Sequence, residues 1–133
     1  MKPLRTLTVT LMTIVSLQAC TPKMAFLNST IAPAVSGNVR VKKDKNANYI
    51  VNVDVANLAP SKNLDPPKNT YIVWMESSDR SVRKLGQLSP SGKSLQAKLT
   101  ATAVSKPDAV FVSAEDNADV EYPAGPTVIT TRK

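Results

Sequence analysis

Apolar and polar residues alternate along several short stretches of the chain, a pattern typical of strands that bury one face. The clearest case is 49–55, where Tyr49 and three valines are expected to point inward and Asn52 and Asp54 outward. Weaker alternation covers 35–41 and 95–104. Residues 71–76 are instead apolar on both alternating faces, which predicts a central strand buried on both sides.

Shorter apolar stretches at 84–88, 109–114 and 127–131 predict three more strands, separated by segments rich in Pro, Gly, Asn and Asp. The interval 94–104 is the one place where Ala and Leu leave helix open as an alternative. About seven short strands predict an all-β antiparallel sandwich, and their number favours an immunoglobulin-like topology. Trp74, the only Trp in the chain, is expected to fill its core.

The first residues have the pattern of an export signal. Lys2 and Arg5 precede a largely apolar stretch at 7–17, and Leu17-Gln-Ala-Cys20 resembles the cleavage motif of bacterial lipoproteins, in which the Cys becomes acylated. An ordinary secretory signal with an incidental Cys is the alternative. We therefore expect a signal peptide at 1–19, lipidated Cys20 with a flexible tether at 20–34, and a folded domain at 35–133.

Composition narrows the function classes. The chain has no His, which excludes Ser-His-Asp and Cys-His chemistry, and its single Cys excludes a disulfide within one chain. Without Lys2 and Arg5, fifteen basic and ten acidic side chains remain. No basic stripe with interleaved aromatics is present, so we expect no nucleic-acid partner. We expect no enzymatic activity, no cofactor and no bound metal.

One loop gathers four carboxylates, Glu115, Asp116, Asp119 and Glu121, next to Tyr122. Carboxylate oxygens are ligands for Ca²⁺, but the spacing matches no known Ca²⁺ loop, and a solvated turn also explains it. Tyr122 is either a partner contact or a cover over one end of the sandwich. A second charged segment, 42–45, reads either as a contact for an anionic partner or as a solvated hairpin turn.

Four motifs carry a resemblance to a known family: Tyr71-Ile-Val-Trp-Met75, Leu85-Gly-Gln-Leu88, Phe111-Val-Ser-Ala-Glu115 and Pro123-Ala-Gly-Pro126 with Val128. In this order they resemble the exported C-terminal domain of anti-sigma-K factors. The resemblance implies a β-sandwich beyond the membrane and no catalytic residues. Family members place a sigma-binding segment and a membrane helix ahead of this domain, whereas a lipid anchor is expected here.

These expectations converge on a non-catalytic lipoprotein of the bacterial cell envelope. The lipid on Cys20 would attach it to a membrane, and Thr21 in place of an Asp favours the outer membrane, facing the periplasm. The sandwich would serve protein interaction or a structural role with an envelope partner. The alternative is a ligand-binding or sensing lipoprotein linked to envelope signalling. A polar cavity would favour the alternative, and an exposed apolar patch the interaction role.

Overall fold

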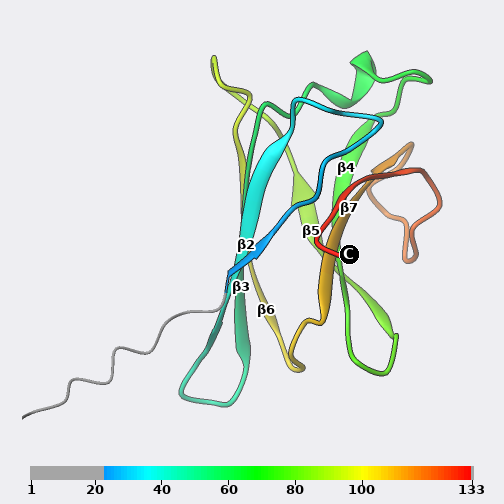
Figure 1. Cartoon of the computed structure of the whole chain (residues 1–133). Helices are drawn as coiled ribbons and strands as arrows, with labels where there is room; N and C mark the ends of the chain where they lie inside the picture. Colours follow the sequence, from blue (N-terminus) through cyan, green and yellow to red (C-terminus); the bar gives the residue numbers. More distant parts are fainter. Residues whose placement is uncertain (1–22, 133) are drawn as a thin grey trace, which may run out of the picture.

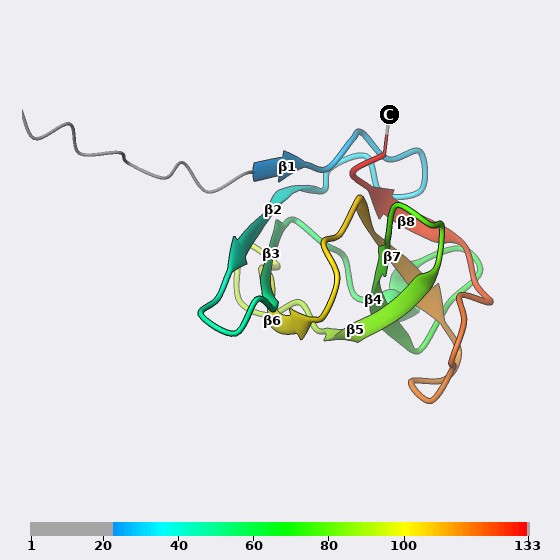
Figure 2. The ribbon, with the colours of Figure 1, turned by 90° about the horizontal axis from the view of Figure 1, so that it is seen from below.

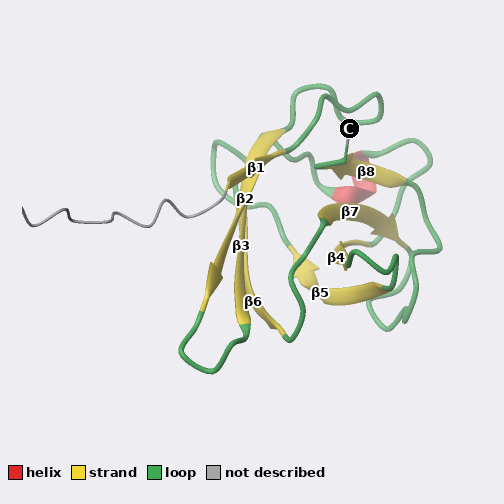
Figure 3. Cartoon of the chain, turned by 60° about the horizontal axis from the view of Figure 1, so that its bottom comes forward, coloured by secondary structure: helices red, strands yellow, loops and turns green. Residues whose placement is uncertain are grey.

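The computed structural model describes residues 23–132, which fold into eight β-strands and one short 3-10 turn (Figure 1). The strands are β1 (Lys23–Ala25), β2 (Ser36–Lys43), β3 (Tyr49–Ala56), β4 (Thr70–Glu76), β5 (Val82–Leu88), β6 (Ala97–Ala103), β7 (Ala109–Glu115) and β8 (Thr127–Thr130), with the turn η1 (Ser61–Asn63) before β4. The interval 94–104, where helix was the alternative, contains β6. Figure 3 shows strands joined by loops, with one short helical turn in red, and the all-β class is confirmed.

The strands form two antiparallel sheets of four, ordered β1-β2-β3-β6 and β5-β4-β7-β8. The chain crosses from one sheet to the other after β3, β5 and β6, as in the Greek-key connections of immunoglobulin-like sandwiches. Figure 2 shows β6 beside β5 where the two sheets meet at one side. The predicted sandwich is confirmed, with eight strands between residues 23 and 132 rather than about seven.

Apolar side chains from alternate positions of both sheets form the core. On β3 the three valines are buried and Asn52 is exposed, as the alternation predicts. The facing sheet contributes Tyr71, Val73 and Met75 from β4, together with Val110, Val112 and Ala114 from β7. Full burial of one such apolar side chain contributes about 1.5–3 kcal/mol, so the core is the main source of stability.

The N-terminal segment joins the edges of both sheets. In β1, Lys23 pairs with Arg40 and Ala25 with Asn38 of β2. Two residues later, the backbone N–H of Leu27 donates to the carbonyl oxygen of Thr130, at the edge strand β8, at 2.9 Å. The segment therefore closes the side of the sandwich opposite to β5 and β6.

The flexible tether predicted for 20–34 is therefore wrong from Lys23 onward, and the folded domain begins before residue 35. Ala32 and Val35 are buried against the core. The apolar residues of this segment have no period because it passes from one sheet edge to the other and never runs along a single face. Cys20, residues 1–19 and the start of the predicted tether lie outside the described residues.

β4 is buried on both faces, as predicted, but Trp74 does not lie between the sheets. Ile72 and Trp74 are fully buried on the outer face of their sheet, outside the core cluster. Lys84 pairs with Trp74 in the register of β5, and its Nζ donates to the carbonyl oxygens of Ala118 and Val120. The loop 116–126 therefore lies over this face, and Trp74 is buried, as predicted, beneath this loop rather than between the two sheets.

Gly86 lies at a bulge in the pairing of β4 with β5. The pairing of β4 with β5 shifts register between Val73 and Trp74, opposite Gly86. A Cβ at this position would lie 3.0 Å from Cδ1 of Leu99 on β6. The glycine therefore lets the edges of the two sheets approach closely.

We expect Trp74→Ala to lower the free energy of unfolding by about 3–5 kcal/mol, the usual range for a truncated buried aromatic. Urea denaturation followed by circular dichroism measures this loss. Trp74→Phe keeps a six-membered aromatic ring and loses the five-membered ring with its N–H donor, so it should cost less than the change to Ala. An Ala variant as stable as the wild type, or wild-type emission like that of free indole in water, would contradict the burial.

Candidate functional site

Glu115, the first carboxylate of the acidic loop, is the last residue of β7 and only 1% exposed. Its Oε1 accepts a hydrogen bond from Ser113 Oγ at 2.6 Å and one from the Ala124 N–H at 3.1 Å. Its Oε2 accepts one from the Gly125 N–H at 2.9 Å. A buried carboxylate needs such partners, and here they come from its own strand and from the far end of the loop. Glu115 therefore holds the loop closed.

The same network reaches the buried Trp. The indole Nε1 of Trp74 donates to Ser113 Oγ at 2.8 Å, and that hydroxyl in turn donates to Glu115. On the loop, a Cβ added to Gly125 would lie 1.8 Å from the carbonyl oxygen of Ala114, so only glycine fits this approach. The segment 123–126 is thus a fixed turn before β8, as its sequence predicts.

The other three carboxylates point away from this network. Asp116 is exposed and pairs with Lys68, with 3.3 Å between Nζ and Oδ2, and Asp119 and Glu121 are also exposed. Between residues 23 and 132 there is no group of three or more His, Cys, Asp or Glu side chains placed to hold a metal ion. The structure does not assemble the four carboxylates into a Ca²⁺ site, and the loop as a partner contact stays a prediction.

Tyr122 is 71% exposed and lines a groove of about 420 Å³ where the edges of β5 and β6 meet. Val104, just after β6, is 73% exposed and lines the same groove. The floor is apolar, with Met75 and Leu85, and the rim carries Arg83, Lys84, Thr102 and Glu121. An exposed aromatic and an exposed valine beside charged groups of both signs suit contact with a protein surface.

The position of Tyr122 depends on the rest of its loop. The bonds from Lys84 to the carbonyl oxygens of Ala118 and Val120 hold the first half of the loop on β5. The bonds of Glu115 to 124 and 125 hold the second half on β7. Tyr122 therefore lies between two attachments, so its ring is presented by an ordered segment.

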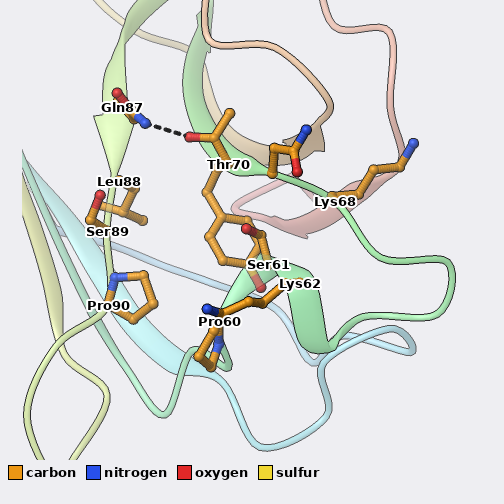
Figure 4. Close-up of a pocket in the computed structure, with 11 residues that line it drawn as sticks. Pro60, Ser61, Lys62, Lys68, Thr70, Gln87, Leu88, Ser89 and Pro90 are labelled. Carbon is orange, nitrogen blue, oxygen red and sulfur yellow. Dashed lines mark hydrogen bonds between the residues drawn. The ribbon is translucent and has the colours of Figure 1, made fainter.

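A second hollow, of about 260 Å³, lies between η1, the start of β4 and the end of β5 (Figure 4). Gln87 Nε2 donates to Thr70 Oγ1 at 2.6 Å across its wall, as the dashed line in Figure 4 shows. The hydroxyl of Tyr71 donates to the carbonyl oxygen of Ala59 at 2.5 Å, and burial raises the pKa of Tyr71 to about 12. These polar groups are paired with one another rather than directed at an empty space.

Sequence reasoning named Tyr122 but missed Val104. The even positions of β6, Lys98, Thr100 and Thr102, form its polar outer face, so the next even residue is also expected to face solvent. An apolar Val104 on a polar face was the signal that could have identified it. Residues of β5, which belongs to the second sheet, line the groove together with Val104. Only the fold shows that β5 lies beside Val104.

Comparisons with protein-family models, with curated proteins and with solved structures find no match. The resemblance to anti-sigma-K domains therefore rests on the sequence motifs alone. Within the described range, no helix is long and apolar enough to cross a membrane.

We expect Glu115→Gln to lower the free energy of unfolding by about 1–3 kcal/mol, because one buried N–H then faces an amide N–H₂ in place of an oxygen. Amide hydrogen exchange should rise across 116–126, since the loop loses an attachment. Asp119→Asn, an equal change at an exposed carboxylate of the same loop, should leave both measurements unchanged. Unaltered exchange in the Gln variant would contradict the role of Glu115.

The raised pKa of Tyr71 predicts that the folded protein loses stability at alkaline pH. Its pKa is raised from about 10 to about 12 in the folded state, so the unfolded chain loses this proton first. The stabilising effect is complete below pH about 10 and disappears as the pH rises towards about 12. Thermal melting should show this fall in the wild type and in Tyr122→Phe, a change at an exposed Tyr. Tyr71→Phe should lack this part of the fall, and an unchanged pH profile would contradict the assignment.

Proposed function

We propose that this protein is a membrane-anchored lipoprotein of the bacterial cell envelope that presents a non-catalytic β-sandwich to a protein partner. The groove between β5 and β6, with Tyr122 and Val104 both more than two-thirds exposed on its walls, carries the proposal. Large exposed apolar side chains on an ordered surface are typical of interaction sites. The partner would cover both side chains and pair with the charges at the rim.

The anchor is proposed from the sequence. The Leu17-Gln-Ala-Cys20 motif after an apolar stretch supports acylation of Cys20, and the absence of an Asp after the Cys supports the outer membrane, facing the periplasm. Acyl chains contribute about 0.8 kcal/mol per buried CH₂, so several of them attach a protein stably. The resemblance to exported anti-sigma-K domains agrees with a sandwich on the outer side of the inner membrane.

The geometry favours binding over catalysis. Glu115, the one fully buried carboxylate among the described residues, has its oxygens occupied by a hydroxyl and two backbone N–H groups. It therefore acts as a structural acceptor. The remaining loop carboxylates are exposed, without the enclosed surroundings that shift a carboxyl group toward acid–base work.

A ligand-binding or sensing lipoprotein, linked to envelope signalling, is the second candidate, and the hollow in Figure 4 is the observation in its favour. Lys62 and Lys68 lie at its rim. Because Thr70 pairs with Gln87, and Lys68 with Asp116, few polar groups are left to orient a small molecule. We therefore prefer the interaction role.

Site-specific photocrosslinking in living cells tests the proposal. A photoreactive phenylalanine analogue at position 122 or 104 should give the same crosslinked protein, because both residues border one groove. At Thr100, which is exposed on the outer face of β6, it should give none. Mass spectrometry of the purified protein should show an N-terminal acylated Cys20.

Two results would count against the proposal. An unmodified Cys20, or cleavage elsewhere, would refute the lipid anchor. Identical adducts at 100, 104 and 122 would show nonspecific proximity and refute the groove as the partner site.

A further inference from the structure

Three turns, 44–48, 77–81 and 104–108, meet at one end of the sandwich, the lower end in Figure 1, together with the last two residues of β2, Lys42 and Lys43. Tyr49 pairs with Ala103, which places the first turn beside the third. The hydroxyls of Ser77 and Ser105 lie 3.1 Å apart, which places the second turn beside the third. We call this surface the basic end, for the charges described next.

Basic side chains outnumber acidic ones on the basic end. Its exposed basic residues are Lys42, Lys43, Lys45, Arg80 and Lys106, and Lys23 and Arg40 adjoin them on β1 and β2. Its three acidic residues are Asp44, Asp79 and Asp108. Asp44 accepts the N–H groups of Asn46 and Asn48, and hydrogen bonds from Ser81 lower the pKa of Asp79, which keeps that carboxylate charged. The seven basic and three acidic side chains leave this surface a net charge of +4.

The chain enters the fold beside this surface. β1 runs antiparallel to β2 and begins at Lys23, opposite Arg40, three residues before the end of β2 at Lys43. The end of β1 that connects to Cys20 is therefore the one nearer the basic end. Only Thr21 and Pro22 separate Cys20 from Lys23, so three residue steps span at most about 11 Å.

We propose that the basic end docks on anionic phospholipid headgroups of the membrane that holds the acyl chains of Cys20. This rests on the lipid anchor of the proposed function and adds an orientation to it. Each Lys or Arg near an anionic surface contributes about 1 kcal/mol. A short covalent connection also holds these side chains at high effective concentration beside the headgroups.

The opposite end is less suited to this contact. Its turns, 57–69 and 89–96, carry three lysines, of which Lys68 pairs with Asp116, and one aspartate, Asp65. The entry of β1, opposite Arg40, lies three residues from the Lys43 end of β2 and four from its Ser36 end, and the Lys23 end of β1 is directed toward the basic end. An anionic polysaccharide would meet the same charges, but only a membrane is brought to the basic end by the anchor itself.

The test uses the purified acylated protein in vesicles. A fluorophore is attached to one introduced cysteine, at Asn46→Cys in the basic end or at Ser91→Cys in the opposite end. With phosphatidylglycerol in the vesicles, brominated lipid should quench the label at 46 and not the label at 91. In vesicles of phosphatidylcholine alone, the quenching at 46 should be lost.

Charge variants give the matched control. The triple change Lys42→Gln, Lys43→Gln and Lys45→Gln should lower the ratio of docked to undocked molecules about a hundredfold, from about 1 kcal/mol per lysine at tenfold per 1.4 kcal/mol. The triple change Lys62→Gln, Lys93→Gln and Lys98→Gln removes the same charge from exposed sites elsewhere and should have little effect. Thermal melting of both variants verifies that they fold.

Each outcome is decisive. Equal quenching at 46 and 91, or equal effects of the two triple variants, in an acylated protein would overturn the docking and leave the anchor intact. Labelling of Cys20 by the dye in the wild type would show a free thiol, which overturns the anchor and this proposal together.

Discussion

The hydrogen bonds to the buried carboxylate of Glu115 are the constraint on which the second half of the structure depends. A buried carboxylate without partners is strongly destabilising, so the fold must bring donors to it. Ser113 supplies one from the same face of β7, and the backbone of 124 and 125 supplies two from the loop. Only a closed loop satisfies all three bonds. The same closure covers Ile72 and Trp74, which an open loop would leave exposed on the outer face of the sheet.

Stability and the proposed site are linked through this loop. The groove needs Tyr122 beside Val104, and the attachments at Lys84 and Glu115 place it there. The indole N–H of Trp74 donates to Ser113 Oγ, which belongs to the same network. A substitution that disturbs the packing around Trp74 should therefore also alter the groove. Trp74 and the loop share a hydrogen-bond network, so the substitution would loosen the loop that positions Tyr122.

The sequence predicts the strands better than their faces. The alternation at 49–55 is unambiguous because polar Asn52 and Asp54 mark the outside. β4 carries no such marker. Alternation places Ile72 and Trp74 on the face opposite Tyr71, Val73 and Met75, but only the fold shows which of the two faces meets the other sheet. Glu115 looks like part of an acidic loop because Asp116 follows it, although its spacing from Ser113 places both on one strand face. β1 is only three residues long and is a strand because it pairs with β2, so no local sequence pattern predicts it.

The short connection between Cys20 and β1 changes what an anchor does in this protein. A flexible tether of about fifteen residues has a root-mean-square length of roughly 20 Å and would let the domain turn freely above the membrane. Pairing of Lys23–Ala25 with β2, and the bond from Leu27 to Thr130, remove most of that freedom. Under the proposed anchor, the same end of the sandwich always faces the bilayer. Val104 belongs to both the basic end and the groove. A partner bound in the groove would therefore lie close to the lipid headgroups. A partner that is itself bound to the membrane has a high local concentration there, which favours its binding.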